Sequence, residues 1–155
     1  MEILQRLQSL DIQLFERLFR HSSHRTVILL AKSFSLSGGG ILHFAVPLLL
    51  FSLGIPDSGR FFITLVVAVG IERGLYLVTA PDKFSFPSGH TSASFLLATV
   101  VSVSYGGIFA GMFIWAAAVA LSRVLLGVHF PGDTLAGALM GVVVGGLTTL
   151  ALGMV

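Results

Sequence analysis

The sequence contains no cysteine and few charged residues, and each shortage narrows what the chain can be. Without cysteine, disulfide bonds, thiol catalysis and cysteine-ligated metal sites are excluded. Only 10% of the 155 residues are charged, whereas a soluble domain typically carries about 25%. The formal net charge of +2 is small and the basic residues are scattered, so no nucleic-acid partner is indicated.

Apolar side chains dominate the composition instead. They make up 55% of the chain, and the mean hydropathy is +0.96. A segment surrounded by lipid must satisfy its own backbone hydrogen bonds, and an α-helix does so. We therefore expect an all-α fold: a polytopic membrane helical bundle in which residues 1–155 form a single membrane-embedded domain.

The apolar stretches predict about six membrane helices. They run over residues 26–37, 41–55 and 61–79, then over two segments within 83–123, and finally over 134–152. The first stretch is short for a full span, which needs about 20 residues. Three glycines, Gly38 to Gly40, separate it from the second stretch.

The N-terminal segment, residues 1–23, has the pattern of an amphipathic helix. Apolar residues recur in it at spacings of three and four, at Ile3, Leu7, Leu10, Leu14 and Leu18. Charged residues fall between them, so the pattern predicts a helix that lies in the membrane interface. Packing of the same helix on the end of the bundle is an equal alternative.

Polar groups that are costly in lipid stand at four places beside the apolar stretches. These places are Arg73, Pro87-Ser88-Gly89-His90, Ser122-Arg123 and His129-Phe130-Pro131-Gly132-Asp133. Because successive membrane helices run in opposite directions, we expect all four places to meet at one membrane face. A random scatter of polar residues would not do so. Residues 73–133 are therefore the predicted catalytic region.

This set of residues contains the groups that phosphoryl transfer requires. Guanidinium groups bind phosphate oxygens through two parallel hydrogen bonds. Backbone N–H groups at Ser88, Gly89 and the start of the following helix can bind an anion. One histidine can attack phosphorus while an aspartate fixes its tautomer, and a second histidine can protonate the leaving oxygen.

The motifs resemble the signature of a family, the type 2 phosphatidic acid phosphatase superfamily of membrane lipid phosphatases. The second part of that signature is matched by Phe86-Pro87-Ser88-Gly89-His90-Thr91. The third part is matched by Ser122-Arg123, five further residues, His129, three further residues and Asp133. The resemblance covers residues 73–133, and the helix that follows is compatible with it.

The first part of the signature departs from the family pattern. Arg73 stands where the family has Lys, and after six intervening residues Ala80-Pro81 stands in place of Arg-Pro. Arg73 can still bind phosphate, whereas Ala80 cannot replace a guanidinium. Lys83, in the same loop, is the residue that could supply a cation instead.

The resemblance implies a role for each matched residue. His129 would be the nucleophile that forms a phosphohistidine, Asp133 would orient it, and His90 would be the acid for the leaving group. The residues expected to bind the phosphate are Arg73, Ser88, Gly89 and Arg123, with Lys83 added from its place in the loop. No metal and no cofactor is implied, and two arginines beside the histidines would disfavour a bound cation.

The expected partners are the bilayer and a lipid phosphate. Short loops leave little room for a closed pocket around a soluble sugar phosphate, whereas a site at the membrane face suits a phosphate at headgroup depth. Undecaprenyl diphosphate, phosphatidylglycerol phosphate, phosphatidic acid and lipid A are all candidates. A phosphotransferase with the same intermediate, and a non-catalytic protein that binds or transports lipid phosphates, are the alternatives.

Basic residues outside the site suggest an orientation. Those predicted to lie on the face opposite the site are Arg6, Arg17, Arg20, Arg25 and Arg60. If that face is cytoplasmic, the site faces outward, so we expect a bacterial inner-membrane protein whose site faces the periplasm. The spacing of Gly137, Gly141 and Gly145 indicates close helix packing, either within the chain or in a dimer, so no oligomeric state is predicted.

Overall fold

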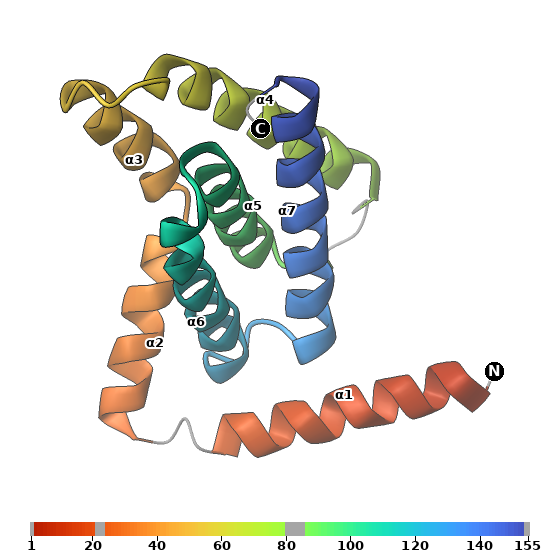
Figure 1. Ribbon diagram of the computed structural model, residues 1–155. Coiled ribbons are helices and arrows are strands. Elements are labelled where there is room, and N and C mark those ends of the chain that lie inside the picture. Colours follow the sequence, from red (N-terminus) through yellow and green to blue (C-terminus); the bar gives the residue numbers. More distant parts are fainter. Residues whose placement is uncertain (1, 21–23, 80–85, 154–155) are drawn as a thin grey trace.

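The computed structural model describes residues 2–20, 24–79 and 86–153, and within these ranges the fold is entirely helical. Seven α-helices follow one another in these described residues (Figure 1): α1 (Glu2–Arg20), α2 (Arg25–Ser37), α3 (Ile41–Ser52), α4 (Ser58–Thr79), α5 (Gly89–Tyr105), α6 (Met112–Leu125) and α7 (Pro131–Ala151). A short 3₁₀ helix, η2 (Gly107–Gly111), joins α5 to α6. The all-α prediction, with an N-terminal helix before the bundle, is confirmed.

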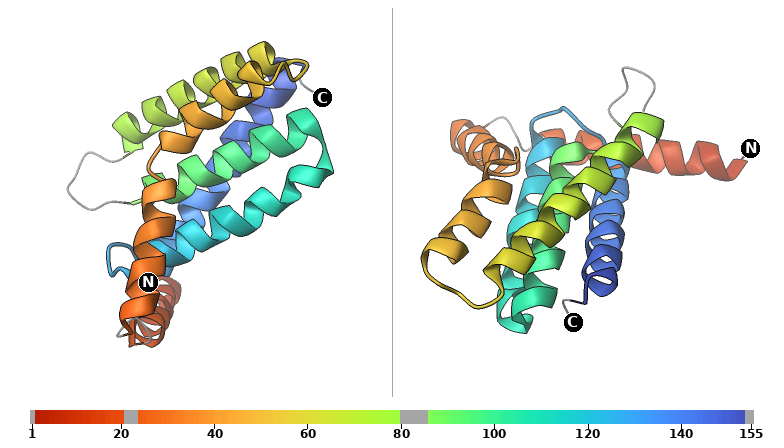
Figure 2. Two further views of the ribbon diagram at one scale, coloured as in Figure 1. Left: turned by 90° about the vertical axis from the view of Figure 1, so that its left-hand side faces the viewer. Right: turned by 90° about the horizontal axis from the view of Figure 1, so that it is seen from above.

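The centre of the bundle is α5, which packs against α4, α6 and α7 (Figure 2). Leu96, Leu97 and Val100 of α5 are fully buried. They form one hydrophobic core with Phe61 and Leu65 of α4, among others. Because α5 is enclosed by three neighbours, its first residues are fixed in place at one end of the bundle.

Glycines on α7 allow the closest of these packing contacts. A Cβ atom at Gly137 would lie 2.6 Å from the carbonyl oxygen of Ser88, and one at Gly141 would overlap the carbonyl oxygen of Ser92. Real Cβ atoms do not approach other atoms so closely, so the two backbones can lie this near each other only with glycine present. Gly137 and Gly141 therefore serve helix packing within the chain.

We expect Gly141→Ala to destabilise the protein, because its new methyl group meets backbone atoms of α5 that cannot rotate away. Overpacking of this kind costs about 1–3 kcal/mol. Thermal unfolding in detergent measures the effect. Gly146→Ala is the matched control on the same helix, since a Cβ atom added there would have no neighbour within 4 Å; it is expected to be neutral or to stabilise by less than about 1 kcal/mol. Equal unfolding temperatures for the two variants would contradict the close packing.

The glycine break between α2 and α3 bends the chain sharply. The two helices meet at 61°, and Gly40 between them has a φ of 98°, a left-handed conformation that glycine adopts without strain. By length and hydropathy, α7 could span a membrane alone, and α2 with α3 could do so as one broken span. That the chain crosses a membrane several times therefore stays a prediction.

The position of α1 corrects the predicted orientation. Figure 1 shows α1 lying across the end of the bundle where α6 ends and α7 begins, with the start of α2 at the same end. Arg6, Arg17, Arg20 and Arg25 thus lie at the end that carries His129, and their assignment to the opposite face was wrong. The cause is the break at Gly38 to Gly40: residues 26–37 and 41–55 were counted as two crossings, whereas α2 and α3 form a single bent unit.

Only Arg60 of those five basic residues lies at the far end of the bundle. Its guanidinium donates to the carbonyl oxygen of Gly153 at 2.9 Å, beyond the last turn of α7. The positive charges therefore do not mark the face opposite the site as cytoplasmic. For α1 the sequence left two alternatives, a position in the membrane interface or packing on the end of the bundle. The second half of α1 packs on the bundle end, through Asp11 and Phe15. Ile3 and Leu7 in its first half are exposed, which is compatible with the interface.

Candidate active site

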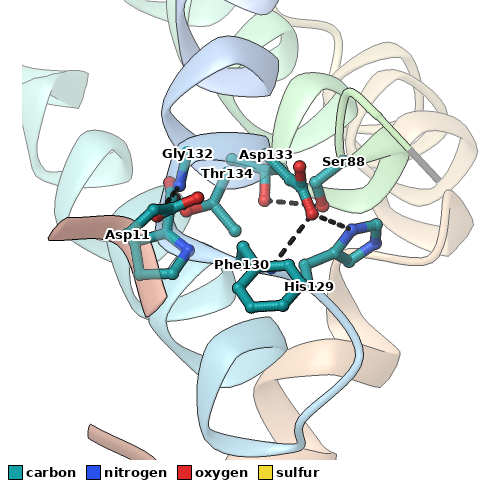
Figure 3. A network of polar contacts seen from close by, with 9 residues as sticks. Asp11, Ser88, His129, Phe130, Gly132, Asp133 and Thr134 are labelled. Atoms are coloured by element: carbon teal, nitrogen blue, oxygen red, sulfur yellow. Dashed lines mark hydrogen bonds and ion pairs between the residues drawn. The ribbon is translucent and has the colours of Figure 1, made fainter. Parts of the chain in front are cut away.

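His129 and Asp133 lie side by side where the loop after α6 enters α7 (Figure 3). The Oδ2 atom of Asp133 is 3.5 Å from Nδ1 of His129, and it accepts a hydrogen bond from the backbone N–H of Phe130 at 3.0 Å. This second contact caps the first turn of α7 and fixes the carboxylate. Since the carboxylate occupies the Nδ1 side of the ring, Nε2 is the ring nitrogen directed away from it.

The start of α5 is tied directly to the start of α7. The backbone N–H of Ser88 donates to the carbonyl oxygen of Asp133 at 3.0 Å, and Thr91 donates its hydroxyl to the Ser88 hydroxyl at 3.0 Å. Ser88 is fully buried, and Gly89 is the first residue of α5. This backbone bond brings the second and third sequence motifs into contact.

His90 stands where the remaining charged residues meet. Arg123, Arg73 and, in its protonated form, His129 all lie near enough for their charges to act on its ring, although these residues come from α6, α4 and the loop before α7. The structure thus brings together the four places with polar residues that the sequence analysis singled out. Lys83, Ala80 and Pro81 lie outside the described residues.

Arg123 is held by a contact that the sequence did not reveal. Its Nη1 donates to the hydroxyl of Ser35 on α2 at 2.6 Å, and Ser35 itself is buried. Within the described part of the chain, the buried Nε of Arg123 has no hydrogen-bond partner. The guanidinium is therefore oriented by α2 and retains a buried donor for which a ligand oxygen would be a suitable acceptor.

A cavity of about 440 Å³ opens beside His90, between α3, α4 and the start of α5. One part of its lining is polar, with His43, Glu72, Arg73 and His90. Its apolar walls are formed by Phe44, Phe62, Leu65, Val66 and Val69. His129 and Arg123 are not among the lining residues, so the cavity meets the rest of the site through His90 and Arg73.

Two buried residues of the cavity were not part of the predicted site. His43 donates from Nε2 to the carbonyl oxygen of Ala93 at 2.8 Å, and Glu72 is only 3% exposed. Glu72 precedes Arg73 in the sequence and was visible there as a charge near the end of an apolar stretch. Its burial inside the cavity depends on α5 packing against α4, which no local pattern reports.

The electrostatic surroundings of His129 favour its neutral form. Burial and the nearby charge of Arg123 hold the pKa of His129 below its ordinary value, while Asp133 acts in the opposite direction. A neutral imidazole has a lone pair available for attack, whereas an imidazolium does not. The arrangement thus suits a nucleophile near neutral pH.

The chain is similar to known proteins in both sequence and structure. A family model described as the PAP2 superfamily matches residues 19–154. The crystal structure of Aquifex aeolicus LpxE superposes with a TM-score of 0.76 at 26% sequence identity, covering 91% of this chain and 95% of that one. The comparison with curated proteins found no significant match.

Proposed function

Because the chain belongs to the PAP2 superfamily, we propose that it is a metal-independent phosphatase that hydrolyses a phosphomonoester or diphosphate of a lipid through a phosphohistidine. One observation carries the proposal: the His129–Asp133 pair meets His90 and two arginines beside a cavity whose walls are apolar. Family membership supports phosphatase activity of the PAP2 type. The proposal goes beyond family membership in two respects, the lipid nature of the substrate and the covalent phosphohistidine intermediate.

The proposed reaction has two steps. In the first, Nε2 of His129 attacks phosphorus, the bond from phosphorus to the leaving oxygen breaks, and His90 gives that oxygen a proton. In the second, a water attacks the phosphohistidine, His90 takes the proton of that water, and the phosphorus–nitrogen bond breaks to release phosphate. Asp133 stabilises the positive charge that His129 gains in the first step.

Cations and backbone donors would hold the phosphoryl oxygens throughout. Arg123 is already oriented by Ser35 and has a buried Nε donor to offer, and Arg73 lines the adjoining cavity. Ser88 and Gly89 stand at the N-terminus of α5, where the helix dipole favours an anion. Lys83 belongs to the same proposal as a further cation in the loop before α5.

The apolar walls of the cavity support a lipid as substrate. A phosphate next to His90 and Arg73 would place the attached chain against Phe44, Phe62 and Val66, which a soluble sugar phosphate could not use. Many large apolar side chains are also exposed on the outer helix surfaces, among them Leu30, Leu48 and Leu147, and bilayer lipid would cover them. We therefore include a multi-pass position in a bacterial inner membrane in the proposal.

A phosphate-release panel with the purified protein in detergent tests this function. Undecaprenyl diphosphate, phosphatidylglycerol phosphate, phosphatidic acid and lipid A are compared with a soluble sugar phosphate, each with and without excess EDTA. We expect release from at least one lipid, faster than from the sugar phosphate, and unchanged by EDTA. Absence of release from every lipid would refute the proposal, and loss in EDTA that a divalent metal restores would show a metal-dependent reaction instead.

The rising limb of the pH profile is expected to follow His129. Since the neutral ring of His129 is the nucleophile and protonated His90 is the acid, kcat/KM should rise with pH through the His129 pKa and fall at higher pH as His90 loses its proton. The midpoint of the rising limb should lie below the ordinary value of about 6.5 because burial and Arg123 lower the pKa of His129. Asp133→Asn removes the group that raises the pKa, so the midpoint should move further down while the plateau falls. The pH profiles of wild type and Asp133→Asn, measured with the same lipid, give the shift. Titration of the substrate affects both profiles equally and so cancels from the difference. An upward shift would contradict the role given to Asp133.

A further inference from the structure

The N-terminal helix α1 contacts the bundle at the turn that carries His129. Asp11, midway along α1, accepts a hydrogen bond from the backbone N–H of Gly132 through Oδ1 at 2.8 Å (Figure 3). Gly132 is the second residue of α7, so its N–H is one of the donors that a helix start leaves without an intrahelical partner. A carboxylate at this position also interacts favourably with the helix dipole.

Two aromatic contacts extend the same interface. The ring of Phe15 lies 5.0 Å from the ring of Phe130, and it stacks on Phe19 at 5.4 Å. Phe19 in turn covers Gly127, where a Cβ atom would lie 2.9 Å from the Phe19 ring. The contacts from Asp11 to Phe19 thus fall on residues 127–132, on both sides of His129.

We propose that Asp11 is a positioning residue for the catalytic turn: it holds the start of α7 so that His129 keeps its alignment with Asp133. This inference rests on the proposed role of His129 as nucleophile. The family match begins at residue 19, so Asp11 and Phe15 belong to a part of the chain outside the matched region. Positioning from α1 is thus an addition to the motifs that the chain shares with its family.

The geometry explains why one hydrogen bond can matter for the reaction. His129 lies outside the helices, between the end of α6 and the start of α7, and the backbone of a loop is less constrained than that of a helix. Gly132 immediately precedes Asp133, whose side chain meets the His129 ring at 3.5 Å. A small movement of Gly132 would therefore move the carboxylate, and misplacement by about 1 Å can cost on the order of 10²-fold in rate.

Two substitutions at Asp11 distinguish a hydrogen-bond acceptor from a general effect of charge. Asp11→Ala removes the acceptor and should lower kcat by roughly 10-fold with little change in KM, because Asp11 bonds to the backbone of Gly132, which has no proposed part in phosphate binding. Asp11→Asn keeps an oxygen in the same place and should retain most of kcat. Glu16→Gln is the matched control, since Glu16 lies on α1 and pairs with the exposed Arg20 rather than with the turn; it should behave as wild type.

Hydrogen exchange gives a readout that does not depend on catalysis. The amide of Gly132 should exchange faster in Asp11→Ala than in wild type or Asp11→Asn, while amides in the middle of α5 should be unaffected. Wild-type kcat in Asp11→Ala would overturn the inference, as would equal loss in Asp11→Asn and Asp11→Ala. If wild type itself released no phosphate from any lipid, the proposed function would fail, and unchanged Gly132 exchange in Asp11→Ala would then independently refute the hold on the turn.

Discussion

Replacement of His129 by alanine is expected to reduce phosphate release from the preferred lipid by more than about 10³-fold. His129 is the one residue that the mechanism requires to bond covalently to phosphorus, and no neighbouring side chain can replace a ring nitrogen aligned by Asp133. The fold should survive, because the ring lies in the loop between α6 and α7 rather than in the hydrophobic core. Initial rates in detergent, with thermal unfolding of the same preparation, measure both quantities.

His24→Ala is the matched control for this substitution. His24 is an exposed histidine immediately before α2 and has no proposed part in the reaction, so its variant should retain wild-type activity. Rapid quenching should also detect a phosphorylated protein in wild type and in His24→Ala, and none in His129→Ala. A folded His129→Ala protein that releases phosphate at an undiminished rate would exclude a phosphohistidine at this position.

Arg123→Ala is expected to lower kcat/KM by about 10²–10³-fold, the usual cost of removing a donor that stabilises charge in the transition state. The guanidinium of Arg123 is half-buried and oriented by the Ser35 hydroxyl at 2.6 Å. Water cannot easily reproduce a charged donor in that position. Arg123→Lys should recover only part of the loss, because an ammonium group cannot bind two phosphate oxygens with the geometry of a planar guanidinium.

Ser35→Ala tests whether the orientation of Arg123 matters as well as its charge. This variant keeps the cation but removes the hydroxyl that holds it, so a smaller loss than in Arg123→Ala is expected. Arg25→Ala, which removes an exposed arginine from the start of α2, serves as the control. If Arg123→Ala and Arg25→Ala had equal kcat/KM, Arg123 would have no part in phosphate binding.

The sequence predicted those features of this protein that local patterns report. The helices over residues 25–37, 41–52, 58–79 and 131–151 were expected within a few residues of their observed bounds, because apolar stretches and Gly38 to Gly40 mark where they start and stop. For the two helices between residues 83 and 125 the sequence predicted the number but not separate bounds. The meeting of Arg73, His90, Arg123 and His129 followed from helix alternation alone. The family resemblance, drawn from two short motifs, was confirmed by the family model that matches residues 19–154.

What escaped prediction depends on contacts between distant segments. Ser35 is an ordinary serine in an apolar stretch until α2 packs against α6, and Asp11 is one of several polar residues on an amphipathic helix until α1 crosses the start of α7. The misplaced basic residues have the same origin, since a helix of 13 residues followed by three glycines can cross a bilayer or bend within it. Hydropathy does not distinguish these two arrangements.

The backbone bond between Ser88 and Asp133 has a mechanical consequence. Together with the glycine contacts of Gly137 and Gly141, it joins the two helices that carry the proposed acid and nucleophile into one stiff unit. A bulky lipid could then be admitted by displacement of α3 and α4, which line the cavity, with the glycine break between α2 and α3 at its edge. Any adaptation of this protein to larger or smaller lipids would accordingly be sought on that side, where substitutions leave the spacing of the two histidines unchanged.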